Sequence, residues 1–130
     1  MKAKILIADD SAYMRSILKD LLLRNGFDVI GEAENGKEAV ELYGKLKPDV
    51  VSMDIMMPEM SGIQALKELK EKYPESKVVI SAAMGQQNLV VEAIRAGAED
   101  FFIKPVQSER VVEAIDKALH QRHHIYTTKE

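Results

Sequence analysis

Apolar residues follow two alternating patterns along the chain. Short runs rich in Val and Ile occur five times, and after each run the apolar residues recur every three or four positions. Short runs bounded by turn residues are typical of strands buried on both faces, while the wider spacing is typical of amphipathic helices. The predicted strands cover residues 3–8, 27–33, 49–54, 77–82 and 100–104, and a helix is predicted after each strand, starting near residues 11, 36, 62, 86 and 108.

This alternation predicts an α/β fold. Parallel strands need a crossover between them, and the crossover is usually a helix, so five strand–helix units favour a three-layer doubly wound fold with a five-stranded parallel sheet. Periodicity alone does not give the strand order. No linker or low-complexity tract divides the chain, which predicts one domain over residues 1–121 and a short polar tail over residues 122–130.

Composition and charge exclude several classes of partner. The chain of 130 residues has a net charge of −3 with both signs interspersed, so it has no basic field for nucleic acid and no polybasic strip for a membrane surface. It has no cysteine, which excludes a disulfide framework and thiolate chemistry. The first apolar run is too short for a signal peptide, and no run reaches the length of about 18 residues that a membrane span requires. We therefore expect a cytoplasmic protein without a nucleic-acid or membrane partner.

Charged residues stand where the predicted strands end. Asp9 and Asp10 follow the first strand, Asp54 ends the third strand and Lys104 ends the fifth. The carboxyl ends of parallel strands meet at one edge of the sheet, where ligands bind in folds of this class, so these side chains should share a crevice. Taken alone, Asp54 could equally be a turn residue or a helix N-cap.

The grouped acids predict a cation and phosphate chemistry. Carboxylates packed together repel one another, and a divalent cation relieves that repulsion. Because the ligands are all oxygen atoms, a hard cation is expected, and Mg²⁺ that keeps several waters fits best. Lys104 adds a point charge suited to a phosphoryl oxygen. An Asp carboxylate can accept a phosphoryl group as an acyl phosphate, which makes Asp54 the natural acceptor.

Five separated blocks of sequence form a specific combination at this spacing: residues 7–11 (IADDS), 34–36 (ENG), 53–62 (MDIMMPEMSG), 96–101 (AGAEDF) and 104–105 (KP). Through these blocks the chain resembles the receiver domain of response regulators, from residue 4 to about residue 119. Within that family the chain is most similar to stand-alone chemotaxis regulators of the CheY type, through residues 83–87 (AMGQQ). The resemblance implies the strand order 2-1-3-4-5 of flavodoxin and CheY.

The resemblance also implies how phosphate would be accepted. Asp54 would take the phosphoryl group from the phosphohistidine of a histidine kinase, and the protein would catalyse only its own phosphorylation and dephosphorylation. Mg²⁺ would be bound by Asp10, Asp54 and the backbone carbonyl of Met56, while Asp9 would act through a metal-bound water.

Further roles concern the phosphoryl group and the signal that it produces. Lys104, with a cis peptide bond to Pro105, would pair with the phosphoryl group. The backbone N–H groups of Met56 and Ala83 would donate hydrogen bonds to its oxygens. Phe101 matches the aromatic switch position. The protein is expected to be a monomer. It would signal by binding a downstream target protein on the face made by the fourth helix, fifth strand and fifth helix.

The chain departs from the family at the end of the fourth strand. Receivers normally have Ser or Thr there, with a hydroxyl that contacts the phosphoryl group, but counting back from Lys104 without gaps places Ala82 at that position. Adjacent strand residues point to opposite faces, so Ser81 could replace it only if the strand slipped or bulged. With Ala82 at the site, phosphorylation is expected to survive while its coupling to Phe101 weakens.

Other functions fit parts of the pattern. A receiver-like interaction module that phosphate does not switch is compatible with Ala82. An aspartyl-phosphate phosphatase that depends on Mg²⁺ requires a second acid two positions after its nucleophile, where this chain has Met56. A flavodoxin-type electron carrier requires a loop that binds the flavin phosphate after its first strand. In this chain acids follow the first strand and would repel that phosphate. We expect His120, His123 and His124 to be solvated residues at a helix end, and the methionines near Asp54 to pack the loop.

Overall fold

A computed structural model describes residues 2–120, in which five strands alternate with five helices. In chain order the elements are β1 (Lys4–Ala8), α1 (Ala12–Arg24), β2 (Asp28–Ala33), α2 (Gly36–Leu46), β3 (Val50–Asp54), α3 (Gly62–Lys72), β4 (Val78–Ala82), α4 (Gln87–Arg95), β5 (Asp100–Ile103) and α5 (Ser108–His120). The predicted alternation is confirmed, with each strand one residue shorter than expected. The predicted tail, with His123 and His124, lies outside the described residues.

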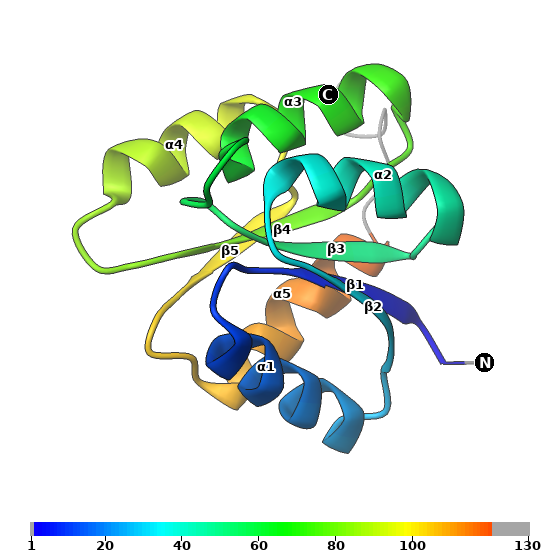
Figure 1. The fold of residues 1–130 in the computed structure, drawn as a ribbon. Coiled ribbons are helices and arrows are strands. Elements are labelled where there is room, and N and C mark those ends of the chain that lie inside the picture. The colour runs from blue at the N-terminus through cyan, green and yellow to red at the C-terminus, as the bar shows by residue number, and fades with distance from the viewer. Residues whose placement is uncertain (1, 121–130) are drawn as a thin grey trace, which may run out of the picture.

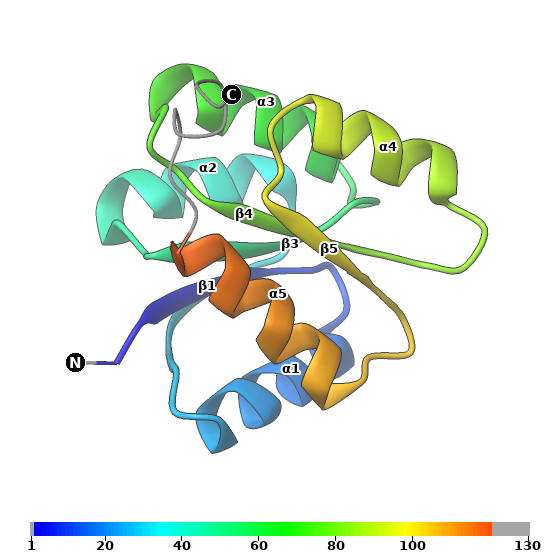
Figure 2. The ribbon, with the colours of Figure 1, turned by 180° about the vertical axis from the view of Figure 1, so that it is seen from behind.

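The strands form one parallel sheet in the order β2-β1-β3-β4-β5, which confirms the α/β fold and the strand order that the resemblance implied. Helices α1 and α5 cover one face of the sheet, and α2, α3 and α4 cover the other (Figures 1 and 2). Every residue of β3 and β4 is buried, as expected of central strands covered on both faces. Within residues 2–120, no helix has the length and apolar character that crossing a membrane would need.

Alternation along the strands divides the apolar core into two clusters. On β4, Val78, Ile80 and Ala82 pack into the cluster under α2, α3 and α4, while Val79 packs into the cluster under α1 and α5. On β5, Phe101 packs with the first cluster and Phe102 belongs to the second. Near the carboxyl edge of the sheet, side chains of neighbouring strands therefore pack against one another only when they lie on the same face.

Two glycines allow the loops at that edge to approach closely. A Cβ atom on Gly62, the first residue of α3, would collide with the carbonyl oxygen of Asp54. A Cβ atom on Gly36, the first residue of α2, would collide with the carbonyl oxygen of Met60, which accepts a hydrogen bond from the Gly36 N–H at 3.0 Å. The loop after β3 is therefore packed between the starts of α2 and α3.

At the amino edge of the sheet, an ion pair joins the end of α3 to the segments that precede β4 and β5. Lys70 Nζ lies 2.8 Å from Glu99 Oε2 and also donates to the Ser76 carbonyl. Glu99 Oε1 accepts from the Val78 N–H at 2.7 Å, which ties the start of β4 to the start of β5. This edge is thus closed by internal contacts, whereas the carboxyl edge carries the grouped acids.

Candidate phosphoacceptor site

The structure brings together the four charged residues that the sequence places at the strand ends. Lys104 Nζ lies 3.0 Å from Asp9 Oδ2 and 3.1 Å from Asp54 Oδ2. Asp9 and Asp54 are buried, at 1% and 7% exposure, while Asp10 is exposed. One carboxylate oxygen from each of Asp9, Asp10 and Asp54 lies within 4.8 Å of the others. The crevice therefore has a buried floor and one acid at its open side.

Asp9 is held in place by contacts from its own loop. Its Oδ1 accepts from the Ser11 N–H at 2.9 Å, and its carbonyl accepts from Arg15 Nη1 at 2.7 Å. Arg15 Nε in turn pairs with Glu32 at 2.9 Å. Arg15 was not predicted from the sequence, because an arginine on a helix face gives no signal that it will return to the preceding loop.

Burial and charge shift the pKa values of the acceptor and the lysine. Burial, aided by the Asp9 carboxylate, raises the pKa of Asp54, although Lys104 and a hydrogen bond with the Met56 backbone oppose the shift. Burial acts to lower the pKa of Lys104, but the carboxylates of Asp54 and Asp9 outweigh it and the pKa is raised. Lys104 is therefore charged at neutral pH and offsets part of the repulsion between the two acids.

The donor set of this crevice fits a hard cation. Three carboxylates within 4.8 Å of one another provide oxygen ligands only, and their mutual repulsion favours a divalent ion. Lys104 already neutralises part of the charge of Asp9 and Asp54 from the inner side. The exposed Asp10 leaves the outer side accessible, so a small ion that keeps several waters, such as Mg²⁺, suits the site.

The end of β4 has the register that the gap-free count predicts. Asp54 is the register partner of Ser81, and Ala82 is the partner of Ile103, with continuous pairing along both neighbours of β4. Ala82 packs in the same cluster as Phe101, whereas Ser81 pairs with Phe102, which belongs to the other cluster. Of the last two residues of β4, the one that shares a face with Phe101 is thus Ala82, which carries no hydroxyl.

The loop residues around the acceptor differ in solvent exposure and in hydrogen bonding. Met56 is 56% exposed and Met84 is 78% exposed, so both residues lie largely at the surface. The Ala83 N–H donates to Gln86 Oε1 at 2.7 Å. A phosphoryl oxygen could use that N–H only after the Gln86 side chain moves, and no pattern in the sequence predicts this contact.

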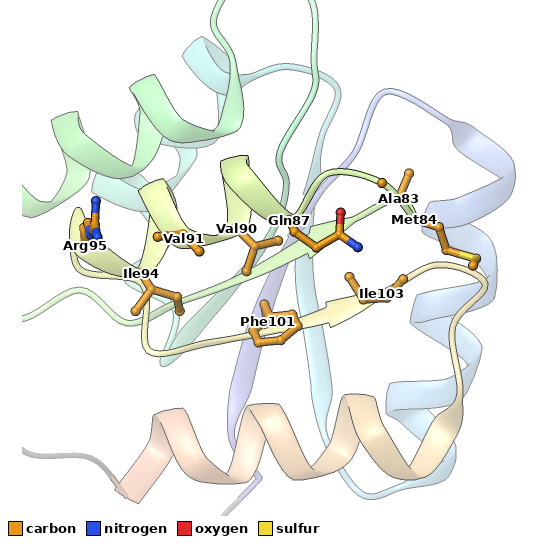
Figure 3. A pocket seen from close by; sticks show the side chains of 10 residues that line it. Ala83, Met84, Gln87, Val90, Val91, Ile94, Arg95, Phe101 and Ile103 are labelled. Atoms are coloured by element: carbon orange, nitrogen blue, oxygen red, sulfur yellow. The ribbon is translucent and has the colours of Figure 1, made fainter.

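A groove of about 620 Å³ runs beside the site, between α4 and β5. Figure 3 shows Phe101 and Ile103 on the β5 side, and Val90, Val91 and Ile94 on the α4 side. Its lining is mainly apolar, and Val91 and Ile94 are exposed. This groove lies on the face where the resemblance places target docking.

Known proteins match nearly the whole chain. The profile of the response regulator receiver domain matches residues 5–116. The chain is 55% identical over 119 residues to the chemotaxis protein CheY of Bacillus subtilis, covering 92% of this chain and 99% of that protein. It is 56% identical over 117 residues to CheY of Thermotoga maritima, covering 90% and 98%.

Solved structures agree with the sequence matches. The response regulator domain of Thermotoga maritima CheB superposes with a TM-score of 0.87 at 35% identity, covering 95% of this chain and all of that domain. CheY in a CheX–CheY–BeF₃–Mg²⁺ complex from Borrelia burgdorferi superposes with a TM-score of 0.86 at 30% identity, covering 92% of this chain and 90% of that one.

Proposed function

The chain belongs to the response regulator receiver family and is homologous to the chemotaxis regulator CheY, and on that premise we propose that Asp54 accepts a phosphoryl group from a histidine kinase. The observation that carries the proposal is the convergence of Asp9, Asp10, Asp54 and Lys104 in one crevice. This arrangement provides a nucleophile, a fixed cation and ligands for a metal ion within a few ångströms.

In the transfer step, a carboxylate oxygen of Asp54 attacks the phosphorus of the kinase phosphohistidine. The new bond joins that oxygen to phosphorus, the bond from phosphorus to the imidazole nitrogen breaks, and the imidazole keeps the electron pair and takes up a proton. Phosphoryl transfer depends mainly on positioning and on neutralising charge. Asp54 is well placed for this role because it is fixed at the end of β3 and paired with Lys104 at 3.1 Å.

Asp10, Asp54 and the backbone carbonyl of Met56 would hold Mg²⁺ beside the acceptor, and Asp9 would act through a water. When bound, the ion would offset the negative charge of the transferred group. The ammonium group of Lys104 would then pair with a phosphoryl oxygen instead of the Asp54 carboxylate. The backbone N–H groups of Met56 and Ala83 would donate to the remaining oxygens, the latter once Gln86 has released it.

The phosphorylated receiver, a monomer, would bind a downstream target protein on the face made by α4, β5 and α5. The apolar groove beside Phe101 supports this assignment. Because Ala82 has no hydroxyl on the face that it shares with Phe101, we expect phosphorylation to move the aromatic ring less than a Ser or Thr there would allow.

Phosphorylation can be tested directly with acetyl phosphate. Wild-type protein incubated with acetyl phosphate and Mg²⁺ should gain the mass of one phosphoryl group, read by intact mass spectrometry. Asp54→Ala should gain none, and Asp20→Ala, which changes an exposed acid on α1, should behave as wild type. The proposal fails if the wild type stays unmodified, or if Asp54→Ala is modified to the same extent.

Coupling to Phe101 needs a separate measurement. Beryllofluoride with Mg²⁺ mimics the phosphoryl group, and backbone amide shifts across α4 and β5 report the response. We expect small shifts in the wild type and larger ones in Ala82→Ser. Equal, full shifts in both proteins would contradict the weak coupling while leaving the acceptor role intact.

A further inference from the structure

Arg110, in the first turn of α5, contacts both the backbone and the ring of Phe101. Its Nη2 donates to the Phe101 carbonyl oxygen at 2.6 Å, and its guanidinium carbon lies 5.2 Å from the centre of the ring. A guanidinium over an aromatic face is attracted by the negative charge density of that face. The α5 helix therefore holds the residue at the switch position from outside the sheet.

Asp100 keeps Arg110 in this place. Its Oδ1 accepts from Nη2 at 2.8 Å and its Oδ2 accepts from Nη1 at 3.2 Å, while Asp100 itself is only 6% exposed. A planar guanidinium can serve both carboxylate oxygens at once, which a lysine cannot do. If Arg110 turned toward solvent, it would leave a buried carboxylate uncompensated, so its position is fixed.

The Phe101 ring separates two hollows on the surface. One is the groove of about 620 Å³ between α4 and β5, and the other, of about 470 Å³, lies between β5 and the start of α5. Phe101 lines both hollows, and Arg110 lines the second. The shape of the surface between α4 and α5 therefore depends on where the ring lies.

Position 82 provides no polar group that could compete with Arg110 for this ring. Ala82 is fully buried in the cluster against which Phe101 packs, and its side chain is a single methyl group. The cation that contacts both the carbonyl oxygen and the ring of residue 101 thus comes from the α5 side.

From these contacts we infer that Arg110 is a positioning residue that sets the resting place of the Phe101 ring and opposes its displacement from that place. The inference rests on the proposed function, because the ring acts as a switch only if Asp54 is phosphorylated. It adds a second control on the switch besides the phosphoryl group: the carboxylate–guanidinium pair between Asp100 and Arg110.

The test compares Arg110→Lys with Glu113→Ala, using protein labelled in its phenylalanine rings. Arg110→Lys keeps a cation near Asp100 but loses the planar contact with the ring and the fork that reaches both Asp100 and the Phe101 carbonyl. Glu113→Ala removes another contact of the same guanidinium, at 3.0 Å, made by a side chain that is 71% exposed. The readout is the ring resonances of Phe101, with those of Phe27, in the core under α1 and α5, as an internal reference.

We expect the Phe101 ring signals to shift in unmodified Arg110→Lys, those of Phe27 to stay unchanged, and Glu113→Ala to match wild type. Beryllofluoride with Mg²⁺ should then move the Phe101 signals further in Arg110→Lys than in wild type. If Arg110→Lys does not fold, Arg110→Gln, which keeps a donor for the Phe101 carbonyl, takes its place.

The inference is overturned if the Phe101 signals of the arginine variant match those of wild type, or if Glu113→Ala shifts them equally. The unmodified proteins test Arg110 without any phosphoryl mimic. A ring shift in the arginine variant, together with no mass gain of wild type on incubation with acetyl phosphate and Mg²⁺, would support the positioning role and count against the proposed function alone.

Discussion

Replacing Lys104 with methionine tests whether this lysine is what allows two carboxylates to be buried side by side. The substitution keeps most of the side-chain volume and removes the ammonium group that lies 3.0 Å from Asp9 and 3.1 Å from Asp54. Asp9 and Asp54 would then face each other without their internal cation. We expect the folded state to lose stability in the absence of Mg²⁺.

The size of the loss follows from the geometry. Each attraction across about 3 Å is on the order of 5 kcal/mol at an effective dielectric constant of about 20, before the cost of desolvation is subtracted. Removing one partner of a buried ion pair typically costs about 3–5 kcal/mol. Lys104 is 22% exposed at its side chain, and Asp54 can take up a proton because its pKa is already raised. Both effects reduce the loss, and we expect about 2–3 kcal/mol at pH 7.

Urea unfolding at pH 7 in EDTA, followed by circular dichroism, measures this loss. Adding Mg²⁺ at about 100 times its dissociation constant should return about 2.7 kcal/mol to the variant. The variant should also bind Mg²⁺ more tightly than wild type, because a competing cation has gone. Lys67→Met is the matched control, since that lysine is 59% exposed and lies 3.7 Å from Glu92, and it should change stability by less than about 0.5 kcal/mol. A Lys104→Met protein as stable as wild type in EDTA would show that Asp9 and Asp54 can be buried side by side without this lysine.

Three other predictions concern the acceptor and its loop. Because the pKa of Asp54 is raised above its ordinary 3.8, this group contributes stability that is present below about pH 3.8 and is lost as pH rises through the raised pKa. Asp54→Asn should therefore unfold at a higher urea concentration than wild type at pH 7 without Mg²⁺, and the difference should disappear near pH 3.8; a difference independent of pH would contradict the assignment. Gly62→Ala should cost about 1–3 kcal/mol in urea unfolding and should also slow phosphorylation, since the new methyl group pushes against the Asp54 carbonyl. Met56→Asn should lose its phosphoryl group severalfold faster in a mass-spectrometric time course, because the exposed thioether crowds water away from the acyl phosphate; an unchanged rate would remove that role.

Much of the fold follows from the sequence because hydrophobic burial sets it. The apolar runs at 50–54 and 78–82 became strands buried along their whole length, and α1, α2 and α3 each start directly after a residue whose side chain caps the helix. Ser11, Asn35 and Ser61 each accept a hydrogen bond from a backbone N–H in the first turn that follows them. Convergence of the strand-end charges follows from parallel topology alone, since all carboxyl ends share one edge.

Contacts made by long side chains could not be predicted in the same way. Arg15 reaches the Asp9 carbonyl and Arg110 reaches the Phe101 carbonyl, yet both occupy helix positions where a solvated arginine gives the same pattern. Gln86 sits before α4 like a helix cap, but its side chain accepts from the Ala83 N–H instead. Such contacts depend on side-chain reach and on the final packing of loops, which periodicity does not encode.

Gly36 and Met60 link two loops that lie far apart in the sequence. Since the Gly36 N–H donates to the Met60 carbonyl and leaves no room for a Cβ atom, the start of α2 and the loop after β3 constrain each other's shape. In a chimera that receives the β3–α3 loop from a relative, residue 36 should be transferred with it. A library that varies residue 36 together with the loop between β3 and α3 should accordingly recover larger residues at 36 only with altered loop sequences.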